Sequence, residues 1–179
     1  AVIAIGLAIA LALAAVGMRS HAHVPGGLEG QMAPRLSLPV ITPTPKPKPV
    51  LYPVPGTHAR PILLHFWGPS CAPCLAELPV IDKLFLAGSD GDAGWEVVTV
   101  TAEDTSDVRE FVNREQTSFP ILQDADGAAH EAWRVSSLPT SYVIRRDGVI
   151  HRELNGKQTE ASLTEALKGA DLAAPATRT

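Results

Sequence analysis

An apolar run at residues 61–67 leads almost directly into two cysteines, Cys71 and Cys74. The run reads Pro-Ile-Leu-Leu-His-Phe-Trp, and a segment of this length and composition predicts a central β-strand that is covered on both faces. Gly68 and Pro69 end the strand, and a helical pattern follows the cysteines. The chain is thereby restricted to folds in which a buried strand brings two cysteines to the start of a helix.

Strand-like and helix-like patterns continue to alternate beyond this point, which predicts an α/β domain. The first helix carries Leu75, Leu78 and Ile81 on one face, and Pro79 should kink it. We expect the remaining elements in this order: a strand at 95–100, a helix capped within 104–106, a strand at 119–122, a short helix at 128–133, a hairpin of strands at 140–144 and 149–154, and a closing helix at 159–172 behind a Thr159 cap.

The N-terminal residues 1–18 contain no charged side chain. As a helix they would span about 27 Å, which is close to the thickness of a hydrocarbon core, so they predict a transmembrane anchor or a signal segment. The run exceeds the usual signal core of about 7 to 15 residues, which favours an anchor, although Ala12 and Ala14 could form a cleavage site. Because no initiator Met precedes Ala1, we expect the printed sequence to begin inside a longer precursor.

Residues 19–56 are rich in proline, most densely at 41–49. Proline removes backbone donors and restricts φ, so we expect an extended polyproline spacer rather than a ligand for a peptide-binding module. The predicted organisation is a membrane or signal segment at 1–18, a linker at 19–56, one domain at 57–172 and a tail at 173–179.

Composition narrows the function classes. The chain has 179 residues, of which 45% are hydrophobic, enough for one compact domain but not for two large ones. Its 15 basic and 19 acidic residues give a net charge of −4 with no long run of either sign. This balance argues against nucleic-acid binding.

The spacing of the two cysteines favours redox chemistry. At a helix N-terminus, unpaired N–H groups and the macrodipole lower the pKa of the first cysteine, so Cys71 is the expected nucleophile. Cys74 lies one helical turn on and could resolve a mixed disulfide formed at Cys71. Half of a zinc site and two inert buried thiols are the alternatives. Zinc is disfavoured because no second cysteine pair and no suitably spaced histidine pair follow the motif.

The stretch from Phe66 to Pro79, FWGPSCAPCLAELP, resembles the active-site segment of thioredoxin-like proteins of the TlpA/ResA type, which are extracytoplasmic thiol-disulfide oxidoreductases. Residues 119–124 and 137–144, and the Asp147-Gly148 turn, are similar to later segments of that family in the same order. The resemblance covers about residues 61–172. It implies a thioredoxin-like fold, with a central mixed β-sheet flanked by helices on both faces, and no bound cofactor or metal.

The resemblance also implies further site residues. A cis peptide is expected before Pro139, in a loop beside the redox pair that contacts the partner chain. Glu77 falls where the family carries an acid that could exchange a proton with Cys74, although a solvated helix glutamate is the alternative. Together with Cys71 and Cys74, Glu77 and Pro139 are the predicted catalytic residues. The predicted substrate contacts are Trp67, Ala72, Pro73, Leu138 and Thr140, with Trp67 and Trp133 also interpreted as core or rim packing.

Two residues depart from the family pattern. Ser70 stands where a Trp usually precedes the first cysteine, and His65 stands where cytosolic thioredoxins carry a buried acid. His65 could relay protons, but a satisfied core histidine is the favoured interpretation.

The leading hypothesis for function is a reductase of disulfides in exported proteins, with apocytochrome c as one candidate substrate and a membrane thiol donor as its source of electrons. The resemblance implies a bacterial cell-envelope location, anchored in the inner membrane with the domain on the periplasmic side, or a secreted form if the first segment is cleaved. A disulfide oxidase or isomerase on the same fold is one alternative. Another is a copper chaperone that uses the two thiolates, although Met18 and Met32 both fall outside the predicted domain.

Overall fold

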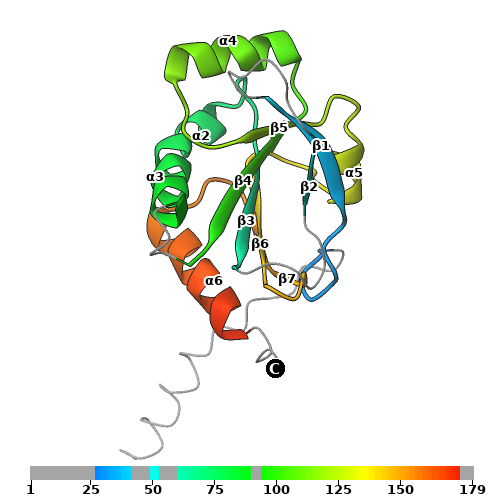
Figure 1. Ribbon diagram of the computed structural model, residues 1–179, viewed down its shortest axis with the longest axis vertical. Coiled ribbons are helices and arrows are strands. Elements are labelled where there is room, and N and C mark those ends of the chain that lie inside the picture. The colour runs from blue at the N-terminus through cyan, green and yellow to red at the C-terminus, as the bar shows by residue number, and fades with distance from the viewer. Residues whose placement is uncertain (1–26, 42–48, 53–59, 90–93, 174–179) are drawn as a thin grey trace, which may run out of the picture.

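The computed structural model describes residues 27–41, 49–52, 60–89 and 94–173. Within these ranges seven strands form one sheet in the order β2-β1-β5-β4-β3-β6-β7 (Figure 1). The strands are β1 (Leu36–Ile41), β2 (Pro49–Tyr52), β3 (Ile62–Phe66), β4 (Glu96–Thr101), β5 (Ile121–Gln123), β6 (Thr140–Ile144) and β7 (Ile150–Asn155). The helices are α2 (Ala72–Leu75), α3 (Leu78–Ser89), α4 (Thr105–Glu115), α5 (Ala128–Ala132) and α6 (Glu160–Ala173).

Strand β3 lies inside the sheet between β4 and β6. It runs parallel to β4 and antiparallel to β6, with His65 opposite Thr99 on one side and Ser141 on the other. All five of its residues are buried. The apolar run that opened the sequence therefore forms the predicted central strand, and the sheet is mixed as expected.

Both faces of the sheet are covered. On one face, Leu63 and Trp67 pack with residues of α3, α4 and α6. On the other, Leu64 and Phe66 pack with α5 and with residues that precede β2. Figure 1 shows α3 and α6 on one side of the sheet and α5 on the other. Because side chains alternate along a strand, β3 contributes to both cores, and the predicted thioredoxin-like arrangement of helices on both faces is confirmed.

The predicted elements between residues 61 and 173 form close to their expected bounds. The helix after the cysteines breaks at residues 76–77 rather than bending at Pro79, so α2 and α3 are separate helices and Pro79 lies in the first turn of α3. Asp104 caps α4 by accepting a 2.7 Å hydrogen bond from the Ser106 N–H. Thr159 Oγ1 similarly accepts from the Ser162 N–H at the start of α6.

The predicted start of the domain at residue 57 is wrong. Strand β1 lies within the region interpreted as a spacer, yet Val40 and Ile41 pair with Leu122 and Ile121 of β5, and β1 also pairs with β2. Leu36 is 2% exposed in the second core. Proline favoured an extended chain, and the described Pro39 and Pro49 do lie in strands, but proline could not show that these strands pair with the sheet edge, where proline is tolerated.

Two other predictions fall on residues that the structure does not describe. The anchor or signal segment at 1–18 lies outside the described ranges, and so do residues 42–48 of the proline-rich stretch. Among the helices that are described, none combines the length and hydropathy that a membrane crossing requires.

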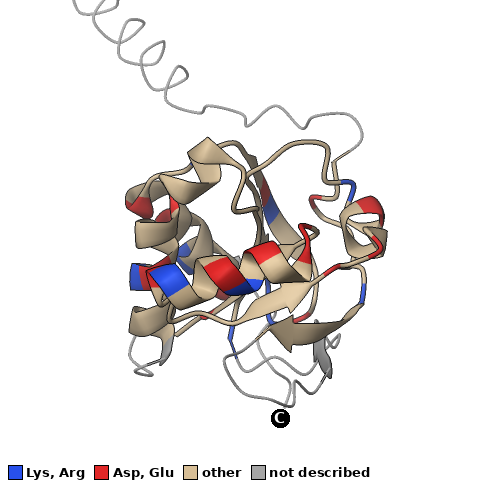
Figure 2. Ribbon diagram, turned by 90° about the horizontal axis from the view of Figure 1, so that it is seen from above, with Lys and Arg blue, Asp and Glu red and all other residues tan. Residues whose placement is uncertain are grey.

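Charged residues of both signs are mixed on the domain surface. Figure 2 shows acidic and basic positions following one another along α4, where Asp107, Arg109 and Glu110 stand close together in the sequence. A surface patterned in this way carries no extended field of one sign along that helix.

Removal of residues 1–56 should destabilise the domain, because it deletes β1 and β2 together with the buried side chains of Leu36, Val40 and Ile41. Burial of one aliphatic side chain contributes about 1.5–3 kcal/mol, so we expect the free energy of unfolding to fall by about 5 kcal/mol. Urea denaturation followed by circular dichroism measures this. A protein lacking only residues 1–26 is the control and should unfold within about 1 kcal/mol of the parent. Equal stability of the two truncated proteins would restore the boundary at residue 57.

Candidate functional site

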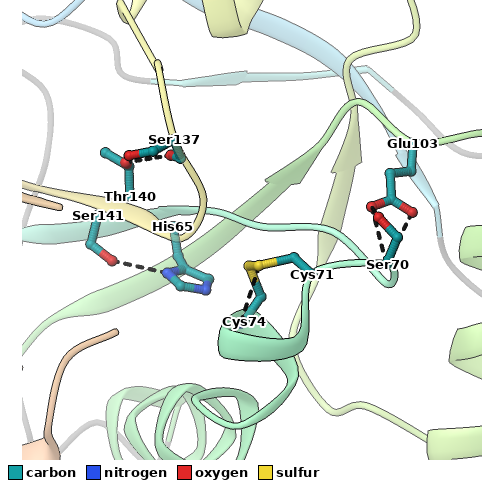
Figure 3. The surroundings of a disulfide bond; sticks show 8 residues. All are labelled: His65, Ser70, Cys71, Cys74, Glu103, Ser137, Thr140 and Ser141. Carbon is teal, nitrogen blue, oxygen red and sulfur yellow. Dashed lines mark hydrogen bonds between the residues drawn. A yellow bond between two sulfur atoms is a disulfide. The ribbon is translucent and has the colours of Figure 1, made fainter. Parts of the chain in front are cut away.

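The two cysteines form a disulfide at the point where β3 gives way to α2 (Figure 3). Cys71 is the N-cap of α2, and its sulfur accepts a hydrogen bond of 3.2 Å from the Cys74 N–H. Pro73 occupies the first turn, where its missing N–H costs no helical hydrogen bond. The predicted position of the pair at a helix N-terminus is therefore observed.

The two sulfur-bearing residues differ in accessibility. Cys71 is partly exposed, whereas Cys74 is 0% exposed and belongs to the core that α3 and α6 cover. Ala72 and Pro73 are both exposed beside Cys71. An incoming disulfide can therefore reach Cys71 but not Cys74 without a movement of the chain, as the predicted roles require.

The loop before β6 lies at the same end of the sheet. The peptide bond between Leu138 and Pro139 is cis, as the family resemblance implied. Thr140 pairs with Phe66, and β3 and β6 are antiparallel. Pro139 therefore lies at the end of β3 from which the chain continues to Cys71. Leu138 is partly buried and packs, as Cys71 does, against the core that contains Cys74. The cis-proline loop and the redox pair thus share one core cluster at one edge of the sheet.

Two of the predicted substrate contacts, Trp67 and Thr140, have buried side chains. Trp67 is 0% exposed, and its ring packs at 5.2 Å from Phe111 and 6.3 Å from Phe119, measured between ring centroids. Thr140 is 1% exposed, and its hydroxyl donates to the Ser137 carbonyl oxygen at 2.8 Å. Neither side chain is available to a docking chain. Both residues instead support the segments that carry the exposed contacts, and the interpretation of Trp67 and Trp133 as packing residues is the one confirmed.

Glu77 is a buried acid next to Cys74. Its N–H donates to the Cys74 carbonyl oxygen at 2.9 Å, its side chain is fully buried, and neither carboxyl oxygen has a hydrogen-bond partner among the described residues. Burial disfavours the charged form and raises the pKa of Glu77 to about 7, an effect that the nearby Gln158 backbone and the Lys157 charge only partly offset. The alternative of a solvated helix glutamate is wrong.

His65 is also buried on the Cys74 side of the sheet. Its Nδ1 lies 2.9 Å from Ser141 Oγ, and its Nε2 has no partner among the described residues. Figure 3 shows the imidazole ring beside the disulfide. Burial lowers the pKa of His65 to about 3, so the ring is neutral at physiological pH. A ring that stays neutral does not take up and release protons near neutral pH, which favours the interpretation of His65 as a core histidine.

Sequence reasoning missed Glu103, which follows β4. Its carboxylate accepts a hydrogen bond from the Ser70 hydroxyl at 2.5 Å, directly before Cys71 (Figure 3). A signal was present: β3 and β4 are parallel, so residues that follow them meet at the same edge of the sheet. The described residues contain no group of three or more His, Cys, Asp or Glu side chains arranged to hold a metal ion.

Comparisons with known proteins agree on the family and the fold. The model of the AhpC/TSA family matches residues 30–153. Thiol-disulfide oxidoreductase ResA from Bacillus thuringiensis subsp. konkukian (strain 97-27) is 34% identical over 108 residues, which are 60% of this chain and 61% of that protein. Thioredoxin-like protein YneN from Bacillus subtilis (strain 168) is 33% identical over 140 residues, 78% of each chain.

A solved structure extends the comparison to three dimensions. The crystal structure of StoA from Bacillus subtilis aligns with a TM-score of 0.61 and 24% sequence identity, over 74% of this chain and 96% of that one. At this level of identity the likeness shows the fold alone. The chain spans about three fifths of the length of the ResA relative named above.

In the reduced protein, Cys71 should be alkylated well before Cys74, because it is partly exposed and caps a helix whereas Cys74 is buried. We expect iodoacetamide at neutral pH to modify Cys71 at least about tenfold faster, a ratio that peptide mass spectrometry after timed quenching measures. Cys74→Ala and Cys71→Ala proteins provide the two single-thiol references. Faster modification of Cys74 would reverse the assigned roles.

Proposed function

The chain belongs to the AhpC/TSA family, and its redox pair lies at the start of a helix. From this site and the similarity to ResA, we propose that the protein is a thiol-disulfide oxidoreductase that reduces disulfides in exported proteins. The observation that carries this proposal is the disulfide between an accessible Cys71 and a buried Cys74 at the N-terminus of α2. Two cysteines so placed can exchange a disulfide with one partner at a time.

The first step of the proposed cycle forms a mixed disulfide. In the dithiol form, the Cys71 thiolate attacks one sulfur of the substrate disulfide, a bond forms between Cys71 Sγ and that sulfur, and the other substrate sulfur leaves as a thiolate that takes up a proton. The exposed Ala72 and Pro73, with Leu138 of the cis-proline loop, are the proposed contacts for the substrate chain. Ala72 and Pro73 follow the attacking Cys71 directly, and Leu138 packs against the same core cluster as Cys71.

The second step releases the reduced substrate. Cys74 loses its proton and attacks Cys71 Sγ, so the internal disulfide forms as the bond to the substrate breaks and the substrate sulfur leaves as a thiolate. Two electrons have then passed from the cysteine pair to the substrate. A dithiol donor restores the pair by the reverse exchange, and the departing Cys74 thiolate takes up a proton again.

We assign the Cys74 proton to Glu77. The Glu77 side chain is buried, its backbone N–H binds the Cys74 carbonyl oxygen at 2.9 Å, and burial raises its pKa to about 7. A group with a pKa near the working pH can accept the proton during resolution and return it during re-reduction. His65 is neutral in both steps because its pKa is lowered to about 3 by burial.

The proposed location and partners rest on the sequence ahead of the domain. An uncharged segment of the length of residues 1–18 would tether the domain to a membrane or direct its export, and disulfide exchange with exported proteins takes place outside the cytoplasm. Apocytochrome c and a membrane thiol donor are the proposed partners. The copper-chaperone alternative rests on the same two sulfur atoms, and among the described residues they belong to no group of three or more His, Cys, Asp or Glu side chains that could hold a metal ion.

The redox assignment is tested by a titration against glutathione and by trapping. We expect a midpoint potential nearer to that of thioredoxin, about −270 mV, than to that of a strong oxidant, about −120 mV. The Cys74→Ala protein should accumulate a mixed disulfide at Cys71 with a disulfide-bonded peptide, detected as an adduct by mass spectrometry, and Cys71→Ala should form none. A potential near the oxidising end would instead support the oxidase alternative.

Glu77→Gln tests the proton assignment, since it keeps the side-chain shape and removes the titration. The pKa of about 7 means that Glu77 is protonated below neutrality and ionised above it, so resolution of the mixed disulfide in the parent should accelerate as pH rises through about 7. In the variant this inflection should vanish and the step should slow roughly 10- to 100-fold. Quenched single-turnover alkylation measures the rate.

His65→Asn is the matched control for this prediction. Asn retains a polar partner for Ser141 and cannot titrate, so the parent inflection near pH 7 should persist. The assignment fails if the Glu77 variant keeps the inflection while the His65 variant loses it.

A further inference from the structure

Glu103 is held in place by two buried side chains. Its N–H donates to Thr101 Oγ1 at 3.3 Å, and its carbonyl oxygen accepts from Gln123 Nε2 at 2.7 Å. Thr101 is 0% exposed and Gln123 is 5% exposed. Because β4 and β5 carry these partners at the end of the parallel part of the sheet, the backbone of Glu103 has little freedom.

The carboxylate of Glu103 reaches across to the segment before the first cysteine. The Ser70 N–H donates to Oε1 at 3.1 Å and to Oε2 at 3.2 Å, and the Ser70 hydroxyl donates to Oε1 at 2.5 Å. Gly68 makes room for this contact, because a β carbon at that position would overlap the carboxyl group. The carboxylate thus lies against the backbone of residues 68–70 and binds both polar hydrogens of Ser70.

This contact lies on the opposite side of the redox pair from the buried His65. Figure 3 shows Glu103 and Ser70 beyond Cys71, with His65 on the other side of the disulfide. Glu77 is connected to the pair through the Cys74 carbonyl oxygen. The carboxylate of Glu103 therefore binds the residue directly before Cys71 and carries a negative charge on that side of the redox pair.

We propose that Glu103 is a positioning residue of the redox site, which fixes the chain entering α2 through Ser70 and whose negative charge disfavours the Cys71 thiolate. The inference deepens the proposed function, on which it rests. The N-terminal N–H groups of α2 favour an anion at Cys71, and a carboxylate bound to the preceding residue, Ser70, opposes them. The balance keeps the dithiol less acidic and the protein more strongly reducing than the CxxC pair at a helix start would be alone.

The two effects of Glu103 can be separated by substitution. Glu103→Gln retains an oxygen that accepts from Ser70 and removes the charge, whereas Ser70→Ala retains the charge and removes one hydrogen bond. Asp104→Asn is the matched control, because it removes the neighbouring charge, and Asn caps a helix about as well as Asp. All three proteins keep Thr101 and Gln123, which hold the backbone of residue 103.

The measurement is the pH dependence of Cys71 alkylation in the reduced proteins at low salt. We expect Glu103→Gln to lower the thiol pKa by about half a unit, to speed alkylation below that pKa about twofold, and to shift the glutathione equilibrium toward the dithiol. Asp104→Asn should leave all three quantities at the parent values. An unchanged or raised Cys71 pKa in Glu103→Gln overturns the electrostatic role.

Salt and the second variant complete the test. Added salt should lower the Cys71 pKa of the parent and have less effect on Glu103→Gln, because screening and substitution remove the same interaction. Ser70→Ala should broaden or displace the near-ultraviolet signals of the site without reproducing the drop in pKa, and the same pKa drop in both variants would overturn the separation of roles. Thiol acidity is measured without a protein substrate, so a protein that fails to reduce disulfides but shows these shifts would refute the proposed function and leave this inference standing.

Discussion

The pairing of β3 with β4 and β6 is the constraint on which the rest of the molecule depends. Every residue of β3 is buried and lies opposite a residue of β4 on one side and of β6 on the other, and the Trp67 N–H extends the pairing by donating to the Val100 carbonyl oxygen at 3.0 Å. The strand leaves the sheet only after this bond, so Cys71 emerges at a fixed place on its edge. Because β4 runs parallel and β6 antiparallel, Glu103 and the cis-proline loop arrive at that same edge from different parts of the chain.

The chemistry of the site depends on the unequal solvent exposure of its two cysteines. Cys71 faces solvent at the cap of α2, where backbone donors can stabilise an anion. Cys74 lies in the core with Glu77 and near His65, where charge is disfavoured. Burial raises the pKa of Glu77 and lowers the pKa of His65, so the acid is poised near neutrality while the imidazole is uncharged. One physical cause thus assigns opposite roles to two buried titratable residues.

The N-terminal hairpin shows how a local pattern can be correct and its consequence missed. Its proline content predicted a spacer, but Val40 and Ile41 extend the sheet by pairing with β5, and Leu36 packs in the second core. Pairing with a sheet edge depends on a partner about 80 positions away in the sequence, Leu122. No property of the proline-rich stretch by itself distinguishes a spacer from such a strand.

The sequence alone determined the α/β alternation, the caps at Asp104 and Thr159, and the place of Cys71 and Cys74 after a buried strand, because each depends on neighbours within a few residues. Only the tertiary structure decided that Trp67 and Thr140 are packing residues, that Glu77 is buried, and that Glu103 binds Ser70. These outcomes depend on which segments cover a side chain, and the covering segments come from distant strands and helices. Burial and cross-strand contact are properties of the assembled sheet, so periodicity along the chain cannot contain them.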